Sequence, residues 1–513
     1  MPAKPAIVID AKTILGPVNR KVFGQVVRGA DRKDVFTDTH DQYITNQSEG
    51  MWDPEHRRPS TNAIAFLKGV NPTILRYPDG LNTQGHDWKK TVGPISERPN
   101  FQFGLDEYMQ VCKAAGAQAQ IVVTEYIGTT QDLADMVEYL NMPATAKYPW
   151  AQKRVQWGHV EPYGVKYFEL GNESWVKKLK GRGAERHNEY TYAKYAKDAI
   201  VAMKKVDPTI QIGVVLMNYP VLASHPWNKQ VLGAVGDLMD FGITHTYCVG
   251  YKGNDMDVDE DRILSAVLPA SEQLEYWLRE LRHRIYKETG RNIPLAITEF
   301  NGMFVQNKPK QYIHSYAPAF FNAEYLRILL KPENNIILAN FWQFFNSYFG
   351  MVQGKTDESL LAMPAYPLFR LWADHFGDLL IKVDVRGEPR VPYQGFGHTA
   401  PAKGDRYQPA AAVEGGDLLS QGIPNLNVMP LKWNGKIKKQ GPRSLTIQLD
   451  QVTKIRYPNL FKVQLPKVLR PTQGAVQYQI SFEMRFVSDT NQPAKVSLGL
   501  GISDGRGWTK QIH

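Results

Sequence analysis

Eight short apolar segments, each with the look of a buried strand, constrain the fold of this 513-residue chain more than any other feature. They lie at Lys21–Val27, Pro72–Tyr77, Gln118–Thr124, Val165–Leu170, Gln211–Leu216, Asp240–Thr246, Pro294–Glu299 and Ile336–Phe344. Between them, apolar residues recur at helical spacing in Leu105–Ala115, Asp132–Leu140, Tyr190–Val206, Ser271–Thr289 and Ala317–Leu330. Strands without strict alternation that alternate with helices predict a parallel sheet, and eight such units predict an α/β fold closed as a (β/α)8 TIM barrel over residues 21–378.

The pattern changes after Asp378, where helical periodicity stops and Pro and Gly become frequent. Alternating, half-buried strands are indicated at Ser444–Leu449, Phe461–Leu465, Tyr478–Val487 and Ala494–Ile502. We therefore expect a C-terminal β-sandwich over residues 379–513, which either braces the barrel or binds carbohydrate. Residues 1–20 hold one early strand that we expect to pair with this sandwich. Because His513 falls inside a strand-like stretch, we also expect a sandwich that is truncated or ends unusually.

Composition indicates an ordinary globular protein, with 43% hydrophobic and 22% charged residues. The length suits one large domain and one smaller domain. The formal charge of +10 is spread over short basic runs rather than a dense stripe, so we expect no nucleic-acid partner. Such a surface is compatible with an acidic polysaccharide.

The two cysteines, Cys112 and Cys248, lie in apolar contexts and are expected to be free thiols. They form no recognisable metal site, and we expect neither a metal nor a cofactor. The first residues of the sequence lack the apolar region of a secretory signal, and no run of 18 apolar residues occurs, so we expect no membrane partner. The localisation stays open between the cytoplasm and secretion after removal of a signal peptide. Oligomeric state is not indicated.

Two glutamates follow predicted strands and carry the chemistry. Glu173 comes just after the fourth strand, and Glu299 ends the seventh. Active sites of this fold lie at the C-terminal ends of the barrel strands. Paired carboxylates about 5–5.5 Å apart are the apparatus of a retaining glycosidase, with one acting as acid and base and the other as nucleophile.

Three neighbouring residues complete this interpretation. Asn172 directly precedes Glu173 and is placed to bond the 2-hydroxyl of a sugar. Glu169 lies inside the fourth strand and is expected to be structural. Glu125 ends the third strand and is the alternative catalytic carboxylate.

Several motifs, in order, resemble the family 51 glycoside hydrolases of clan A, best known as α-L-arabinofuranosidases. They are Ile74–Gly80, His86–Trp88, Val92–Pro94, Phe103–Tyr108 and Glu161–Tyr167 running into Gly171–Glu173. The resemblance covers about Lys21 to Asp378. It implies that Glu173 is the acid/base and Glu299 the nucleophile, and that the subsite of the cleaved sugar is lined by Asn172, His245, Tyr247 and Gln343. Trp342, between apolar neighbours, is expected in the core.

Two departures from the family pattern concern sugar recognition. Where the family has a Glu after the first strand, this chain has Arg28, and the family's Asn after the second strand is one place late, at Asn82. The chemistry is therefore expected to be kept, while the substrate is open to change.

The leading prediction is a retaining hydrolase of polysaccharides or oligosaccharides, arabinofuranosidase-like. One alternative is an endo-β-glycanase or a hydrolase of an anionic, uronic or sulfated glycan held by Arg28 and Arg76. The other is a carbohydrate-binding protein without catalysis.

Overall fold

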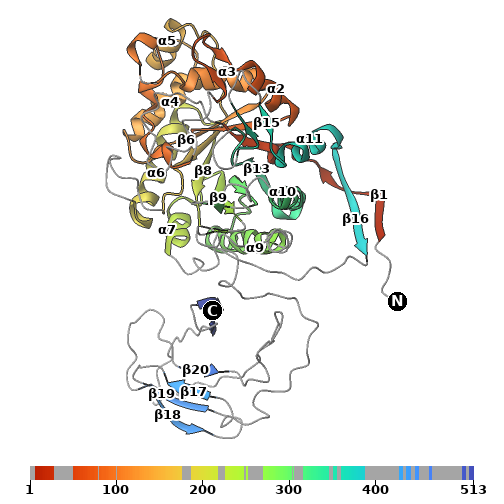
Figure 1. The fold of residues 1–513 in the computed structure, drawn as a ribbon. Coiled ribbons are helices and arrows are strands. Elements are labelled where there is room, and N and C mark those ends of the chain that lie inside the picture. Colours follow the sequence, from red (N-terminus) through yellow and green to blue (C-terminus); the bar gives the residue numbers. More distant parts are fainter. Residues whose placement is uncertain are drawn as a thin grey trace. The chain divides into compact units, whose positions relative to one another are not determined.

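The protein forms the expected closed barrel in a computed structural model (Figure 1). The structure describes residues 6–27, 50–78, 80–99, 101–175, 187–217, 226–247, 250–251, 270–302, 304–305, 316–345, 350–354 and 360–386, and six short strands between residues 427 and 512.

All eight predicted barrel strands are confirmed, and every neighbouring pair in the barrel is parallel. Around the barrel the order is β11-β13-β2-β5-β6-β7-β8-β9. The strands are β2 (Gly24–Val26), β5 (Ile74–Tyr77), β6 (Gln118–Val123), β7 (Tyr167–Leu170), β8 (Gln211–Val215), β9 (Phe241–Tyr247), β11 (Leu295–Asn301) and β13 (Ile336–Phe341). Gln118 is exposed, and Gln211 and Ile337 are half-buried. All other residues of the barrel strands are buried, which explains their near-continuous apolar sequence.

Helices cover the outside of the barrel (Figure 1). The five predicted helices are present as α3 (Leu105–Ala115), α4 (Thr130–Asn141), α6 (Glu189–Val206), α9 (Ala270–Thr289) and α10 (Tyr316–Leu329). Within the described ranges, four further helices were not predicted: α2 (Thr61–Gly69), α5 (Pro149–Gln156), α7 (Pro226–Val235) and α11 (Ala365–His375). All four are 11 residues or shorter, so their apolar periodicity is difficult to distinguish from that of a loop.

Side-chain caps fix where two of the predicted helices begin. The Asn188 side chain accepts hydrogen bonds from the backbone of Tyr190 and Thr191 at the start of α6. At the start of α4, Thr129 and Asp132 cap each other's backbone N–H groups. Such caps satisfy backbone donors that the first turn of a helix leaves free.

Short elements fill the loops. The 3₁₀ helices in the described part of the chain are η1 (Arg20–Phe23), η2 (Gly80–Gly85), η3 (Trp88–Lys90), η4 (Ile95–Glu97) and η7 (Pro332–Asn334). Small two-stranded sheets pair β3 (Trp52–Asp53) with β4 (Arg58–Pro59), β10 (Gly250–Tyr251) with β12 (Phe304–Val305), and β14 (Val352–Gln353) with β15 (Leu361–Ala362).

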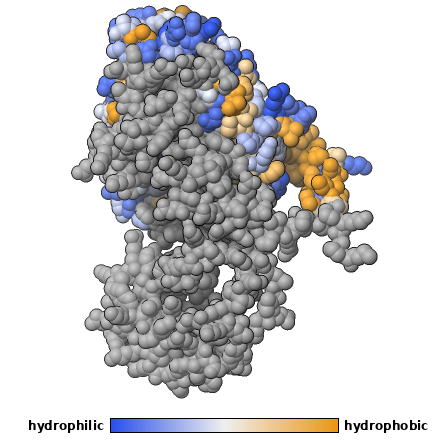
Figure 2. Space-filling model, in the orientation of Figure 1, coloured by the Kyte–Doolittle hydropathy of each residue, from blue (hydrophilic) through white to orange (hydrophobic). Residues whose placement is uncertain are grey.

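The N-terminal strand β1 (Ala6–Pro17) pairs antiparallel with β16 (Leu379–Arg386), and the two form a ribbon that projects from the barrel (Figure 1). Figure 2 shows apolar residues gathered on this ribbon. The exposed ones include Ile7, Ile9, Ile14, Leu379 and Val385. The partner of β1 thus comes from the sequence just beyond the barrel.

The chain divides into two compact units, Met1–Arg390 with Phe396–Thr399, and the remaining residues to His513. In the second unit, β17 (Asn427–Pro430) pairs with β20 (Phe461–Gln464), β18 (Gly435–Gln440) with β19 (Leu445–Leu449), and β21 (Leu500–Ser503) with β22 (Trp508–Ile512), all antiparallel. The expected strands at Tyr478–Val487 and over most of Ala494–Ile502 lie outside the described residues. The domain limits and the sandwich stay predictions.

Cys112 is a buried free thiol, as expected, and burial raises its pKa to about 12. Cys248 lies outside the described residues. Within the part of the chain that the structure describes, no helix is long and apolar enough to cross a membrane.

Two glycines offer a test of the barrel packing. A Cβ on Gly213 of β8 would clash with the ring of Phe241 on β9, whereas a Cβ on Gly233, an exposed position of α7, would have no atom within 4 Å. We expect Gly213→Ala to lower the free energy of unfolding by about 1–3 kcal/mol through overpacking. Gly233→Ala is the matched control, and it should raise that free energy by up to about 1 kcal/mol because Ala favours the helix. Urea unfolding followed by circular dichroism measures both, and equal effects would contradict the packing.

Candidate active site

Glu173 stands on a tight turn at the C-terminal end of β7. The strand ends at Leu170, and Gly171 and Glu173 both have positive φ, 86° and 47°. A positive φ is uncommon for a residue with a side chain, so the surrounding structure must hold this turn in place. The Glu173 side chain is 23% exposed, which leaves its carboxylate open to the mouth of the barrel.

Glu299 lies inside β11, which continues to Asn301. The register between β11 and β9 shifts between Ile297, opposite Thr244, and Glu299, opposite His245. This bulge lets two successive residues of β11 approach one imidazole: the hydroxyl of Thr298 lies 3.0 Å from its Nε2, and Oε2 of Glu299 lies 3.4 Å from its Nδ1. The Glu299 side chain is only 5% exposed.

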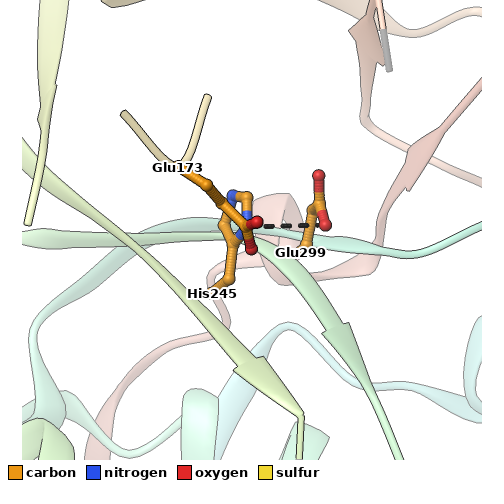
Figure 3. Close-up of side chains that lie close together, drawn as sticks. All are labelled: Glu173, His245 and Glu299. Atoms are coloured by element: carbon orange, nitrogen blue, oxygen red, sulfur yellow. Dashed lines mark hydrogen bonds and ion pairs between the residues drawn. The ribbon is translucent and has the colours of Figure 1, made fainter. Parts of the chain in front are cut away.

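His245 joins the two carboxylates, as Figure 3 shows. Its Nδ1 lies 2.9 Å from Oε1 of Glu173. One nitrogen of His245 and one oxygen from each of Glu173 and Glu299 all lie within 4.8 Å of one another. Because these residues come from β9, β11 and the turn after β7, the fold brings together side chains that are far apart in the sequence.

A buried guanidinium supports Glu299 from below. Arg76 of β5 is completely buried, and its Nη1 donates to Oε1 of Glu299 at 2.9 Å. Its Nε and Nη2 donate to the two carboxylate oxygens of Glu169 at 2.7 and 3.2 Å. Nη2 also donates to Oδ1 of Asn172 at 2.7 Å. Glu169 is therefore structural, as expected, and its neighbour Gln120 donates to it as well.

These contacts shift the pKa values of the group. Burial alone would lower the pKa of Arg76, but the carboxylates of Glu169 and Glu299 outweigh it and raise that pKa, so the guanidinium stays charged. Burial raises the pKa of Glu299, although His245 and Arg76 act in the opposite direction. For His245 burial favours the neutral form, and the negative charges of Glu299 and Glu173 prevail and raise its pKa.

Two aromatic residues border Glu299. The hydroxyl of Tyr247, two residues after His245 on β9, donates to Oε2 of Glu299 at 2.5 Å. Residues two apart on a strand face the same side, which places both beside this carboxylate. The indole of Trp342 meets the ring of Tyr247 edge-on, with centroids 6.1 Å apart, and is half-buried. The prediction that Trp342 lies in the core is therefore wrong. The residue directly follows β13 and lies next to the site.

The other predicted site residues divide into two groups. Asn172 and Gln343 are buried, the first beside Arg76 and the second directly after Trp342. Arg28 and the side chain of Asn82 lie outside the described residues, so their predicted role in sugar binding stays a prediction. The role of Arg76 as a ligand of an anionic sugar also stays a prediction. The hydrogen bonds given above for the Arg76 guanidinium all go to protein groups.

The cluster of Glu173, His245 and Glu299 is also a set that could offer ligands to a cation. The guanidinium of Arg76, however, already places a fixed positive charge 2.9 Å from Glu299. A second cation at this point would meet its repulsion in a low-dielectric interior. The donor set therefore suits a pair of working carboxylates better than a metal centre.

Sequence comparison relates this barrel to arabinofuranosidases. The family profile of the alpha-L-arabinofuranosidase 1 domain matches residues 66–251. An intracellular exo-α-(1→5)-L-arabinofuranosidase of Halalkalibacterium halodurans is 24% identical over 342 residues, which cover 61% of each chain. The chain thus spans less than two thirds of that relative's length. The α-L-arabinofuranosidase C of Emericella nidulans is 30% identical over 179 residues, 32% of this chain and 34% of its own.

Solved structures agree. The α-L-arabinofuranosidase of Thermotoga maritima in complex with arabinose has a TM-score of 0.61 and 26% identity, covering 75% of this chain and 76% of its own. The family 51 α-L-arabinofuranosidase of Thermotoga petrophila has a TM-score of 0.64 at 24% identity, covers 80% of this chain and 81% of its own, and supports the same fold. The sequence and structural similarities together show that this chain is similar to the α-L-arabinofuranosidases of glycoside hydrolase family 51.

Proposed function

We propose that this protein is a retaining glycoside hydrolase that cleaves α-L-arabinofuranosides from oligosaccharides or polysaccharides. The observation that carries the proposal is that one carboxylate oxygen of Glu173 and one of Glu299 lie within 4.8 Å of each other at the mouth of the barrel. Retaining enzymes hold their carboxyl groups about 5–5.5 Å apart, whereas inverting enzymes need about 6.5–9.5 Å to admit a water. The arabinofuranosidase relatives favour this substrate over the endo-β-glycanase and anionic-glycan alternatives.

The surroundings of Glu173 and Glu299 favour a different role for each carboxylate. Glu299 is buried, and each of its oxygens accepts a hydrogen bond, from Arg76 and from Tyr247. A carboxylate fixed in this way is suited to attack the anomeric carbon. Glu173 is more exposed and can reach both a leaving oxygen and an incoming water, as an acid/base must.

The proposed reaction has two steps. Glu299 attacks the anomeric carbon while Glu173 gives its proton to the departing oxygen, and a glycosyl ester forms on Glu299. Glu173, now ionised, then takes a proton from water, which breaks the ester and releases the sugar with its configuration retained. His245, bonded to Glu173 at 2.9 Å, is placed to hold that carboxyl at the right distance through both steps.

The direct test is a screen of aryl glycosides and intact polysaccharides. We expect the wild type to hydrolyse an aryl α-L-arabinofuranoside faster than the corresponding pyranosides, and NMR should show the first product with retained configuration. Inversion, or turnover of no glycan at all, would overturn the proposal.

Replacement of the two glutamates should separate their roles. Glu299→Ala should lower kcat by at least about 10⁴-fold, because no nucleophile remains. Glu173→Ala should lower kcat/KM by about 10²- to 10⁴-fold on substrates with poor leaving groups and much less on activated aryl glycosides. Azide, which needs no general base, should then restore turnover. Glu275→Gln, at a buried carboxylate bonded to Lys331 and Asn334, is the control and should leave the rates unchanged. Near wild-type turnover of an unactivated substrate by either alanine variant would refute the assignment.

The pH profile should report the ionisation of Glu299. The nucleophile works only when ionised, so activity is lost as the pH falls through its pKa, which burial raises above its ordinary value. The Tyr247 hydroxyl bond lowers this pKa, so Tyr247→Phe should move the acid limb of kcat/KM to higher pH. It should also lower the rate about 10- to 100-fold, as expected for a lost bond to a charged group.

Tyr163→Phe provides the matched control for this profile. It removes a similar bond, 2.8 Å long, from a tyrosine hydroxyl to the buried carboxylate of Asp106, outside the site. The acid limb should not move in this variant. An acid limb that stays in place in Tyr247→Phe, or that moves equally in both variants, would count against Glu299 as the titrating group.

A further inference from the structure

Glu125, which has no part in the proposed reaction, lies directly beneath the turn that carries Glu173. It follows β6, whose last residue, Val123, pairs with Leu170 at the end of β7. The backbone N–H of Gly171 donates to the carbonyl oxygen of Val123 at 2.9 Å, so the two chains stay side by side beyond the strands. The Glu125 side chain therefore ends where the turn from Gly171 to Ser174 begins.

The turn is folded around this carboxyl group. The hydroxyl of Ser174 donates to Oε1 of Glu125 at 2.8 Å, and the backbone N–H of Asn172 favours the ionised form of the carboxyl group and so lowers its pKa. A Cβ on Gly171 would lie 2.9 Å from the carboxyl carbon of Glu125 and 2.5 Å from the Ser174 oxygen. Glycine is required here both for its φ of 86° and because the carboxyl group occupies the space that a side chain would fill.

Burying a carboxyl group at this position costs free energy. Glu125 is buried, and its Oε2 has no hydrogen-bond partner among the described residues. Among the described residues its neighbours are uncharged: Tyr192 and Tyr195 approach from α6, and the ring of His187, whose pKa burial lowers, bonds the Glu125 carbonyl oxygen at 3.0 Å. Burial raises the pKa of Glu125 to about 7. An apolar side chain would avoid this penalty but would leave the Ser174 hydroxyl without this acceptor.

We propose that Glu125 is a positioning residue whose carboxyl oxygen anchors the turn from Gly171 to Ser174 and thereby holds Glu173 in its left-handed backbone conformation. This inference rests on the proposed function, in which Glu173 is the acid/base. Glu173 has a φ of 47°, which a residue with a side chain rarely adopts unless its surroundings impose it. Without the anchor the turn relaxes and the Glu173 carboxyl moves from the leaving oxygen, and a displacement of about 1 Å can cost about 10²-fold in rate.

Two nearly isosteric substitutions separate the anchor from simple packing. Glu125→Met keeps the length of the side chain but offers no oxygen, whereas Glu125→Gln keeps an acceptor. We expect Glu125→Met to lower kcat/KM by about 10- to 100-fold on an arabinofuranoside with a poor leaving group, with KM little changed. On an activated aryl substrate, whose departure needs little acid assistance, the loss should be under about threefold. Glu125→Gln should stay within about threefold of the wild type on both substrates.

A double-mutant cycle shows whether the effect passes through Glu173. In the Glu173→Ala background, Glu125→Met should cause no further loss, because the group that it positions is absent.

Asp106→Asn, at another buried carboxyl group bonded by Tyr139 and Tyr163, is the control and should lower stability without distinguishing the two substrates. Ser174→Ala removes one donor of the turn. It should give a weaker version of the Glu125→Met pattern, and it replaces that variant should Glu125→Met not fold.

Equal losses on both substrates, a full further loss in the Glu173→Ala background, or a Gln variant as impaired as the Met variant would overturn the inference while leaving the proposed function intact. If the wild type hydrolyses no glycan, the proposed function fails by itself. The crystal structure of Glu125→Met then decides on the anchor. A Glu173 φ that leaves the left-handed region supports it, and an unchanged turn refutes it.

Discussion

The buried guanidinium of Arg76 is the interaction on which the active end of the barrel depends. A positive charge with no exposed surface must be compensated, and here the carboxylates of Glu169 and Glu299 do so from two other strands. Removing one partner would leave an unpaired charge in the interior, so the three residues stabilise one another's positions. The structural need for a counter-ion therefore fixes the side chain proposed as nucleophile, and stability and chemistry share one network.

The two proposed catalytic carboxylates are held by different means. Glu299 belongs to a barrel strand, and a bulge, a guanidinium and a tyrosine hydroxyl set its direction. Glu173 stands on a turn outside the strand, open to the mouth of the barrel and bonded to His245. A rigid nucleophile and a more accessible acid/base are what a double displacement requires, because only the second group must serve both a leaving group and a water.

Local patterns predicted most of the frame. The eight strands are recognisable because residues buried on both faces leave continuous apolar runs, and α3 begins and ends where its periodicity does. The helices α2 and α5 were not predicted because nine and eight residues give too few turns for a clear period. Trp342 was misplaced for a related reason: apolar neighbours in sequence say nothing about which side of the strand end opens to the site.

The sequence by itself determined the barrel and the placing of Glu173 and Glu299 near its active end, since both follow from local periodicity and from the rule that parallel strands share one active end. Only the tertiary structure decided the partners. Arg76 reaches Glu169 across 93 residues and Glu299 across 223, and Ser174 reaches Glu125 across 49. Such contacts arise from barrel closure and strand register, which bring distant segments to one point. No local pattern encodes them.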